Sequence, residues 1–334
     1  MILVTGATGL LGSHLLLHLI AHLPQNTAIR ATFRSQKRID SNPILNQLPK
    51  NRIEWIEADV LDVFALQKVF ENITHVYHAA AMVSFDPKDA QKMLRTNITG
   101  TANVVELCQQ HHARLVHVSS IAALGNAQNE GKPIDEQNTW KDDEHNASYA
   151  QSKFHSEMEV WRGIEEGLNA AVVNPSVILG EGNWGDWSGQ LVATVWKGMP
   201  FYTSGATGYV DVKDVAKCMV LVMDSGVVDQ RFILNAVNLP LRTVFDAIAL
   251  GLNKKPSSIY LPWWLSNIGW RVLALMGKLT GKRAFITKEL VYSAYEKAQY
   301  SNDKLKKQFS DFEFQDIDVS IKRICKSFLS TVNQ

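Results

Sequence analysis

The sequence has few cysteines, no long apolar run and no excess of either charge. Its 334 residues include Cys108, Cys218 and Cys325, which lie too far apart for a CxxC metal site or a disulfide framework. No run of 18 uncharged apolar residues appears, so no membrane span is expected. The net charge of +1 gives no reason to expect a nucleic-acid partner. Because residues 1–4 are typical of a buried strand and not of a leader, we expect a cytoplasmic protein.

Short apolar runs alternate with amphipathic stretches in the first half of the chain. The expected strands are residues 2–5, 28–33, 53–57, 74–78, 114–119 and 170–174. The expected helices between them are residues 10–22, 63–70, 89–110 and 148–166. Alternation at these lengths predicts an α/β fold, a Rossmann-type doubly wound parallel sheet with right-handed crossovers. Such sheets bind ligands beyond the carboxyl ends of their strands.

The alternation weakens after Pro175. Residues 181–189 are rich in Gly and Trp and are expected to form a loop, whereas residues 209–223 and 231–235 restore strand and helix patterns. From residue 239 onward the pattern is mostly helical. We therefore predict a discontinuous division. Residues 1–174 plus 209–238 form the cofactor domain, and residues 175–208 plus 239–334 form a smaller, mostly helical substrate lobe.

A glycine-rich segment, TGATGLLG at residues 5–12, follows the first strand and opens a helix. Glycines there permit a tight turn, close approach to a pyrophosphate and helix–strand packing, and the helix N-terminus favours an anion. The spacing is GxxGxxG and not the common GxGxxG, and a purely structural turn is the alternative. Its position after the first strand favours a dinucleotide site. The expected contacts are Gly6, Thr8, Gly9, Leu10, Leu11 and Gly12.

The end of the second strand indicates which dinucleotide is used. A ribose-binding acid is expected about 20 residues past the loop, yet Arg34 stands there, followed by Lys37 and Arg38. A guanidinium can pair with a 2′-phosphate through charge-assisted hydrogen bonds, although a solvated basic loop is the alternative. The sequence therefore predicts NADP(H) in preference to NAD(H), with Arg34 and Arg38 as contacts.

Other cofactor contacts are expected at the ends of the following strands. Asp59 is placed to accept from an adenine amine, or else to cap the next helix, for which Asp62 is better placed. Small residues after the fourth strand would let a cofactor lie against backbone. The remaining expected contacts are Val60, Ala79, Ala80, Ala81 and Val118.

Tyr149 and Lys153 lie four residues apart on one face of an expected helix. A tyrosine with a pKa of about 10 is a poor acid–base group near neutrality. A nearby ammonium, together with an oxidised nicotinamide, would lower that pKa. Ser120, at the end of the fifth strand, would hold a substrate oxygen beside Tyr149.

Taken together, these motifs resemble those of the extended short-chain dehydrogenases/reductases over nearly the whole chain. The matching segments are residues 5–12, 58–60, 78–81, 97–101, 118–120, 149–153, 174–176 and 209–216. The resemblance implies that Tyr149 is the acid–base residue, that Lys153 binds the nicotinamide ribose and tunes Tyr149, and that Ser120 orients a carbonyl.

The resemblance also carries smaller implications. Asn97 stands where the family has an asparagine in its catalytic set, or else satisfies backbone groups in a bent helix. Pro175 and Ser176 would lie near the nicotinamide carboxamide. Residues 209–216 are interpreted as a packing signature between the lobes, and a homodimer is expected from the resemblance alone.

Within that family, Arg34 and residues 174–180 look most like the dihydroflavonol reductase and 3β-hydroxysteroid dehydrogenase-like branch. We therefore predict an NADP-dependent carbonyl reductase or alcohol dehydrogenase acting on a small, somewhat hydrophobic substrate. One alternative is an NAD-dependent sugar-nucleotide epimerase or dehydratase with a resident cofactor, which usually carries an acid where Arg34 stands. Another is a non-catalytic NADP-sensing protein, against which the intact YxxxK pair argues.

Several further residues have more than one interpretation. Ser84, Trp184 and Trp187 are candidate substrate contacts, with packing between lobes as the alternative for the tryptophans. His14 and His18 begin a run that repeats every four residues to His22, but no Cys or carboxylate completes a metal site, and none is expected.

The Trp-rich segment 261–279 has apolar residues spaced alternately four and three. This spacing predicts an amphipathic helix with one face packed on the protein core. A lid over an apolar substrate is the second interpretation. A dimer contact and a membrane-surface patch are the others.

Overall fold

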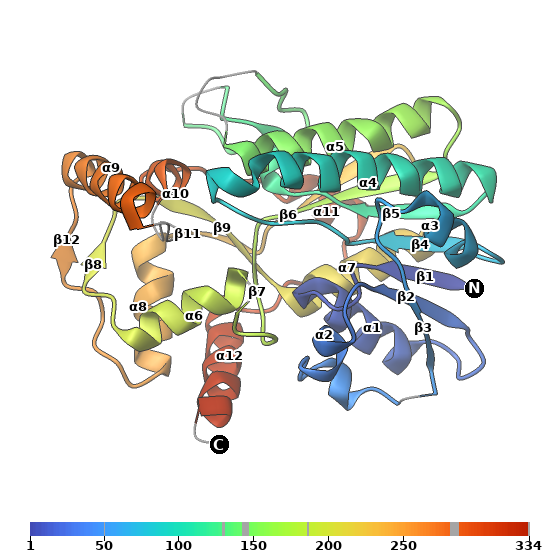
Figure 1. The fold of residues 1–334 in the computed structure, drawn as a ribbon, viewed down its shortest axis with the longest axis horizontal. Coiled ribbons are helices and arrows are strands. Elements are labelled where there is room, and N and C mark those ends of the chain that lie inside the picture. Colours follow the sequence, from blue (N-terminus) through green and yellow to red (C-terminus); the bar gives the residue numbers. More distant parts are fainter. Residues whose placement is uncertain (50, 129–130, 142–146, 186, 281–286, 333–334) are drawn as a thin grey trace.

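The computed structural model describes residues 1–49, 51–128, 131–141, 147–185, 187–280 and 287–332. Within them, seven parallel strands form the main sheet in the order β10-β6-β5-β4-β1-β2-β3 (Figure 1). The strands are β1 (Ile2–Thr5), β2 (Ile29–Phe33), β3 (Ile53–Glu57), β4 (His75–His78), β5 (Arg114–Val118), β6 (Ala170–Pro175) and β10 (Gln230–Leu234). The chain order reverses between β1 and β4, which makes the carboxyl ends of these two strands the expected ligand position.

Helices cover both faces of this sheet because each carries one apolar face. On one face α1 (Leu10–His22) packs with α7 (Val212–Asp224) against the first core. On the other, α3 (Val63–Val69), α4 (Ala90–Gln110) and α5 (Ser148–Glu165) enclose the second core. The short α2 (Gln36–Asp40) follows β2. The predicted Rossmann-type fold is confirmed.

The rest of the chain forms a smaller, mostly helical part with its own apolar core. A three-stranded sheet, β11-β9-β7, contains β7 (Val177–Leu179), β9 (Ala206–Asp211) and β11 (Val237–Pro240). A two-stranded sheet pairs β8 (Phe201–Tyr202) with β12 (Ile259–Tyr260). The helices of this part are α6 (Trp187–Lys197), α8 (Leu241–Gly251), α9 (Trp263–Thr280), α10 (Lys288–Ser293) and α12 (Ile317–Val332). The short α11 (Asp303–Gln308) instead packs on β10, and its Leu305 belongs to the first core of the main sheet.

The connection between the two parts contains a partly buried ion cluster. Arg323 of α12 donates to Asp211 at 2.7 Å and to Glu181 at 3.0 Å. Lys213 contacts Glu181 at 3.4 Å. Asp211 ends β9 and caps α7, accepting from the Lys213 amide. These contacts tie α12 to the start of α7.

Two expectations about the second half require correction. Residues 181–189 are not wholly a loop, because Trp187 begins α6. The apolar stripe of 261–279 is helical, as predicted, but it is not packed on the core: Leu265, Ile268, Val272 and Leu275 are exposed. The helix contacts α10 through its opposite side, which leaves the stripe facing outward. The proposed boundary at residue 208/209 falls inside β9, and the division into two lobes stays a prediction.

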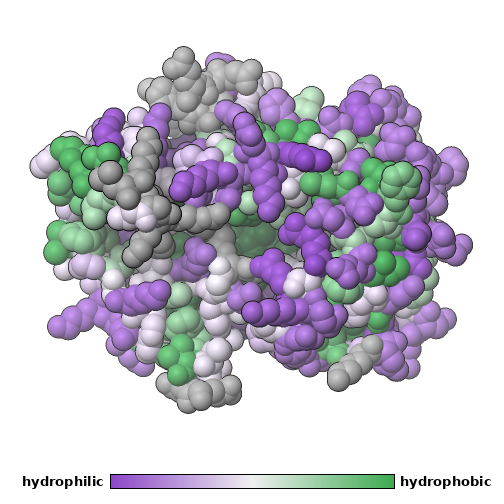
Figure 2. Space-filling view, in the orientation of Figure 1, coloured by the Kyte–Doolittle hydropathy of each residue, from purple (hydrophilic) through white to green (hydrophobic). Residues whose placement is uncertain are grey.

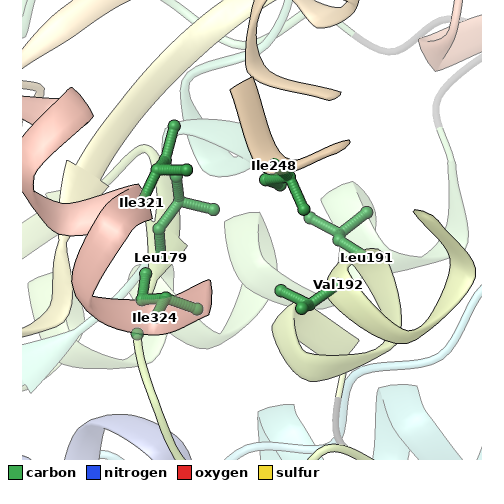
Figure 3. A pocket seen from close by; sticks show the side chains of 7 residues that line it. Leu179, Leu191, Val192, Ile248, Ile321 and Ile324 are labelled. Atoms are coloured by element: carbon green, nitrogen blue, oxygen red, sulfur yellow. The ribbon is translucent and has the colours of Figure 1, made fainter. Parts of the chain in front are cut away.

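A small apolar cavity of about 10 Å³ lies inside the second part (Figure 3). Its lining includes Leu179, Leu191, Val192, Ile248 and Ile321. The volume is about that of one water molecule, and no polar side chain is present to hold one. The cavity contains no candidate catalytic residue, so we interpret it as a packing defect.

Candidate active site

The glycine loop after β1 closes tightly against β4. Gly6 has a φ of 67°, and a Cβ there would lie 2.6 Å from the backbone of Ala79 and Ala80. A Cβ on Gly12 would overlap the Gly6 carbonyl oxygen. Both positions therefore require glycine, the first because of its backbone conformation as well as its close contact. Gly9 has more room, since the Gly6 oxygen at 3.3 Å is the one neighbour near its Cβ position.

The N-terminus of α1 is suited to a pyrophosphate. Gly9 precedes the helix, its amide donates to Gly6, and the first turn has neither an acidic residue nor a side-chain cap. The first amides of a helix have no partner within that helix, and here they belong to Leu10, Leu11 and Gly12. The loop lies beside Ala79 at the point where the sheet order reverses. Thr8 is partly buried within it. These features fit a dinucleotide.

Arg34 lies just past the end of β2 and is exposed. Its Nη1 is 3.7 Å from Oδ2 of Asp59, which lies just past the end of the neighbouring β3. Asp59 also accepts from the Leu61 amide, while Asp62 caps α3, as expected. Arg38 lies on α2, the next element along the chain, and is exposed. Two exposed arginines, Arg34 and Arg38, and the carboxylate of Asp59 therefore lie at the carboxyl ends of β2 and β3.

Ser120, Tyr149 and Lys153 come together at the carboxyl end of β5. Ser120 caps the short 3₁₀ helix Ile121–Leu124, where its Oγ accepts from the Ala122 amide at 3.1 Å, and its hydroxyl is hydrogen-bonded to Tyr149. Tyr149 is the second residue of α5, and Lys153 follows one turn later. The Lys153 Nζ donates to the Val118 carbonyl at 2.8 Å. The three side chains predicted to act together are thus adjacent.

Burial controls the proton affinities of this set. Desolvation raises the pKa of Tyr149, against the opposing hydrogen bond from Ser120. Desolvation lowers the pKa of Lys153 to about 8, although the nearby Glu157 carboxylate opposes that shift. The expected lowering of the tyrosine pKa is therefore not present in the protein alone, because burial outweighs the stabilisation of the phenolate.

Asn97 fastens α5 to the segment after β4. Its Oδ1 accepts from the Met82 amide at 2.7 Å, and its Nδ2 donates to the Met82 carbonyl at 2.9 Å and to Ser152 Oγ at 3.0 Å. Ser152 lies between Tyr149 and Lys153 on α5. Asn97 therefore links α5 to the segment after β4, through backbone groups of that segment and not of its own helix.

Other expected contacts lie at the same sheet edge. The Val60 carbonyl accepts from Asn103 of α4, and Ala79 and Ala80 are partly buried, whereas Ala81 is exposed. Pro175 ends β6 and is buried. Ser176 follows it, and its hydroxyl donates to the Leu234 carbonyl of β10.

Comparison with known proteins supports this arrangement. The family described as the NAD dependent epimerase/dehydratase family matches residues 2–235. The chain belongs to that family. It is an NAD(P)-dependent oxidoreductase of the extended short-chain dehydrogenase/reductase type, and the resemblance seen in the sequence is confirmed.

Relatives of this epimerase/dehydratase family member include reductases. A provisionally named dihydroflavonol 4-reductase from Synechocystis is 29% identical over 291 residues, covering 82% of this chain and 80% of that protein. Anthocyanidin reductase from Arabidopsis thaliana is 26% identical over 272 residues, covering 73% and 78%. A UDP-glucose 4-epimerase from Thermus thermophilus, solved with NAD, has a TM-score of 0.74 at 20% identity and 98% coverage of both chains, and shows the shared fold.

Glu157 is a site residue that the sequence reasoning missed. This buried carboxylate accepts from Ser119 at 2.5 Å, from Asn174 at 2.7 Å and from Trp161 at 3.1 Å, and pairs with Arg231 at 3.2 Å. The Asn174 amide also donates to the Ser120 carbonyl at 3.0 Å. Glu157 therefore joins α5, the end of β5, β6 and β10 directly behind the candidate catalytic residues. The available signal in the sequence was a glutamate four residues after Lys153, one helical turn further along α5.

Two buried histidines lie next to Lys153. His78 is held by Thr5 at 2.7 Å and Thr101 at 3.1 Å, and its ring centroid is 5.2 Å from that of His117. Burial lowers the pKa of His78 to about 3 and that of His117 well below its usual value, and the Lys153 charge acts in the same direction on both. Both rings are therefore neutral at pH 7, whereas Lys153, with a pKa of about 8, is largely protonated.

Phe85 is a second residue that the sequence did not indicate. Its ring centroid lies 5.6 Å from that of Tyr149. The neighbouring Ser84 donates to Asp89 at 2.9 Å, so this predicted substrate contact has a protein partner. An aromatic side chain beside the tyrosine makes this side of the site apolar.

Of the two tryptophans predicted to contact substrate, the structure describes the side-chain contacts of Trp184 alone. The Trp184 ring meets Phe328 of α12 edge-on at 5.0 Å, and its Nε1 donates to Thr331 at 3.3 Å. These contacts place Trp184 against the core of the second part, whereas the alternative interpretation was packing between the lobes. Trp187 starts α6, but its side chain lies outside the described residues. His14 Nε2 donates to the Glu181 carbonyl at 2.8 Å, while His18 and His22 stack on each other.

Proposed function

We propose that this enzyme transfers hydride between NADP(H) and a small carbonyl or alcohol substrate, with Tyr149 as the acid–base residue. The observation that carries the proposal is the meeting of Ser120, Tyr149 and Lys153 at the carboxyl end of β5, where Ser120 bonds Tyr149 and Lys153 bonds Val118. The glycine loop lies at the same sheet edge. Phe85 beside Tyr149 favours a substrate with an apolar group next to its carbonyl.

Each residue of the set has its own role in the proposed reaction. Ser120 and the Tyr149 hydroxyl hold the substrate oxygen, and Tyr149 donates its proton to that oxygen as reduction proceeds. Its raised pKa suits this direction, because the phenol stays protonated until the oxygen acquires charge. Lys153 holds the nicotinamide ribose and favours the tyrosinate that remains. The bound nicotinamide supplies the hydride.

The identity and the amount of nucleotide that stays bound to the purified protein test this proposal. Freshly purified protein is denatured, and any released nucleotide is identified and counted by mass spectrometry. An exchanging cosubstrate predicts little nucleotide, or NADP at less than one per chain. About one NAD per chain would contradict the proposal and support an epimerase or dehydratase with a resident cofactor.

Replacing Arg34 with Ser is expected to weaken NADPH binding by about 10- to 100-fold, because charge-assisted hydrogen bonds to the 2′-phosphate are lost. NADH affinity should change little, since NADH has no 2′-phosphate. Titration calorimetry with both nucleotides measures the two changes. Arg52→Ser is the matched control, because Arg52 lies at the opposite end of the strands and donates to Pro24. Equal effects of Arg34→Ser on both nucleotides would contradict the NADP preference.

The buried Lys153 is expected to make stability rise with pH above about 8. Its folded pKa of about 8 lies below its usual value of 10.5. Below pH 8 it is charged in both states, so the folded protein bears the full cost of burying the charge. Between pH 8 and 10.5 only the folded form loses its proton, and that cost is relieved.

Urea unfolding of the nucleotide-free protein and of Lys153→Met at pH 7 and pH 10 measures this effect. The unfolding free energy of wild type relative to the variant should increase by about 2–3 kcal/mol across that interval. A difference that stays constant would mean that the lysine is not destabilised by burial.

A further inference from the structure

The outward face of α9 is an apolar stripe. Five of its residues are more than half exposed: Trp264 at 62%, Leu275 at 60%, Ile268 and Met276 at 54%, and Val272 at 51%. At about 100° per residue, six exposed apolar residues fall within about 120° of the helix circumference. They are Trp264, Leu265, Ile268, Val272, Leu275 and Met276. Figure 2 shows hydrophobic atoms gathered at the left of the molecule, where Figure 1 places α9 and β12.

The other side of α9 is fixed to the protein. The Trp263 ring meets Tyr292 and Tyr295 edge-on, at centroid distances of 4.8 and 5.3 Å. Ser266 is hydrogen-bonded to the Tyr295 hydroxyl at 2.6 Å. These contacts set the rotation of the helix, and they leave the apolar stripe pointing away from α10. The neighbouring strand β12 adds two exposed apolar side chains, Ile259 and Tyr260.

The charge of this part of the chain is unlike that of the rest. The whole sequence has a net charge of +1, yet residues 247–288 contain no Asp or Glu. The same residues include Lys254, Lys255, Arg271, Lys278, Lys282, Arg283 and Lys288. Arg271 is exposed, and it lies one step beyond the Trp264 edge of the stripe, where its guanidinium rests 4.6 Å from the Trp270 ring. An apolar stripe bordered by Arg271, in a segment whose sequence has basic residues and no acidic ones, is complementary to an anionic lipid surface.

We propose that α9 docks the protein onto an anionic phospholipid bilayer, lying in the plane of the interface. The stripe would enter the boundary between headgroups and acyl chains, and Arg271 at its edge would meet the phosphates. Among the described residues, no helix combines the length and the apolarity that are needed to cross a membrane, so this contact is peripheral. A symmetric contact between two copies would bring two acid-free basic segments together, which disfavours self-association through this face.

The surface adjoins the candidate active site. Glu289 of α10 accepts from the amide and the hydroxyl of Ser148, the first residue of α5, at 3.0 and 2.9 Å. One short helix therefore separates the docking surface from Tyr149. Docking is a property of the protein surface, and it does not depend on the reaction proposed above.

Co-sedimentation with sucrose-loaded vesicles tests the proposal. Wild type should sediment with vesicles of phosphatidylcholine mixed with phosphatidylglycerol, and much less with phosphatidylcholine alone. Ile268→Ser should lower the partition coefficient at least about tenfold, because an inserted apolar side chain is lost. Arg271→Gln should lower it about fivefold on the anionic vesicles. Phe64→Ser is the matched control: Phe64 is 82% exposed on α3, and its replacement should change nothing.

Three results would overturn the proposal. Wild type could fail to sediment with anionic vesicles at low salt. Phe64→Ser could reduce binding as much as Ile268→Ser, which would mean that the interaction is non-specific. Light scattering could show that Ile268→Ser converts a dimer into a monomer without any vesicle binding, which would assign the stripe to a second copy. None of these readouts requires turnover, so each leaves the proposed reaction to its own tests.

Discussion

Replacing Tyr149 with Phe is expected to lower the rate of carbonyl reduction by about 10²–10⁴-fold, the usual contribution of a positioned acid. The substitution removes the hydroxyl that Ser120 contacts and leaves the ring beside Phe85. Folding and NADPH affinity should stay close to those of wild type. Steady-state oxidation of NADPH against a panel of aromatic aldehydes and ketones measures the rate.

Tyr260→Phe is the control for that experiment, because this exposed tyrosine on β12 lies outside the catalytic set. It should retain wild-type turnover. If Tyr149→Phe turned over as fast as Tyr260→Phe, the proton would come from another group, and the proposed role of Tyr149 would be wrong.

Replacing Glu157 with Ala is expected to lower the free energy of unfolding by about 3–5 kcal/mol. The substitution leaves the buried side of Arg231 without its carboxylate, and it removes the acceptor for Ser119, Asn174 and Trp161. Uncompensated buried polar groups, more than the loss of the ion pair itself, account for a cost of this size. Guanidinium chloride unfolding followed by circular dichroism measures it.

A neighbouring glutamate on the same helix provides the comparison. Glu159 pairs with Arg162 at 3.0 Å near the surface, and Glu159→Ala should cost less than about 1 kcal/mol. Glu157→Gln adds a second readout, because the carboxylate raises the pKa of Lys153. The pH at which Lys153 loses its proton should therefore shift downward in that variant. Similar losses in Glu157→Ala and Glu159→Ala would show that the buried network does not stabilise the fold.

The main sheet and its helices could be predicted from the sequence because their signals are local. Apolar runs bounded by turn residues gave β1 and β3 with the observed bounds, and the period of α1 gave residues 10–22. The glycine loop and the YxxxK pair are also local patterns, and the order of strands and helices is sufficient to place them at one sheet edge.

What could not be predicted depends on contacts between distant residues. Glu157 is one of several glutamates on its helix, and only the fold brings Arg231 to it across 74 positions. Phe85 lies in an irregular segment whose path no periodicity specifies. The stripe of α9 was recognised as amphipathic, but the sequence does not say whether an apolar face meets the core or the solvent. That depends on which side Tyr292 and Tyr295 occupy.

The transfer of hydride from the cofactor to a substrate carbonyl is the central claim, and isotope transfer tests it most directly. The purified enzyme is incubated with NADPH deuterated at the transferring position and with a panel of hydrophobic aldehydes and ketones, and the products are analysed by mass spectrometry. We predict an alcohol carrying one deuterium for each NADPH oxidised, formed by wild type and not by Tyr149→Phe. No labelled alcohol from any substrate, together with about one tightly held NAD per chain, would contradict the account.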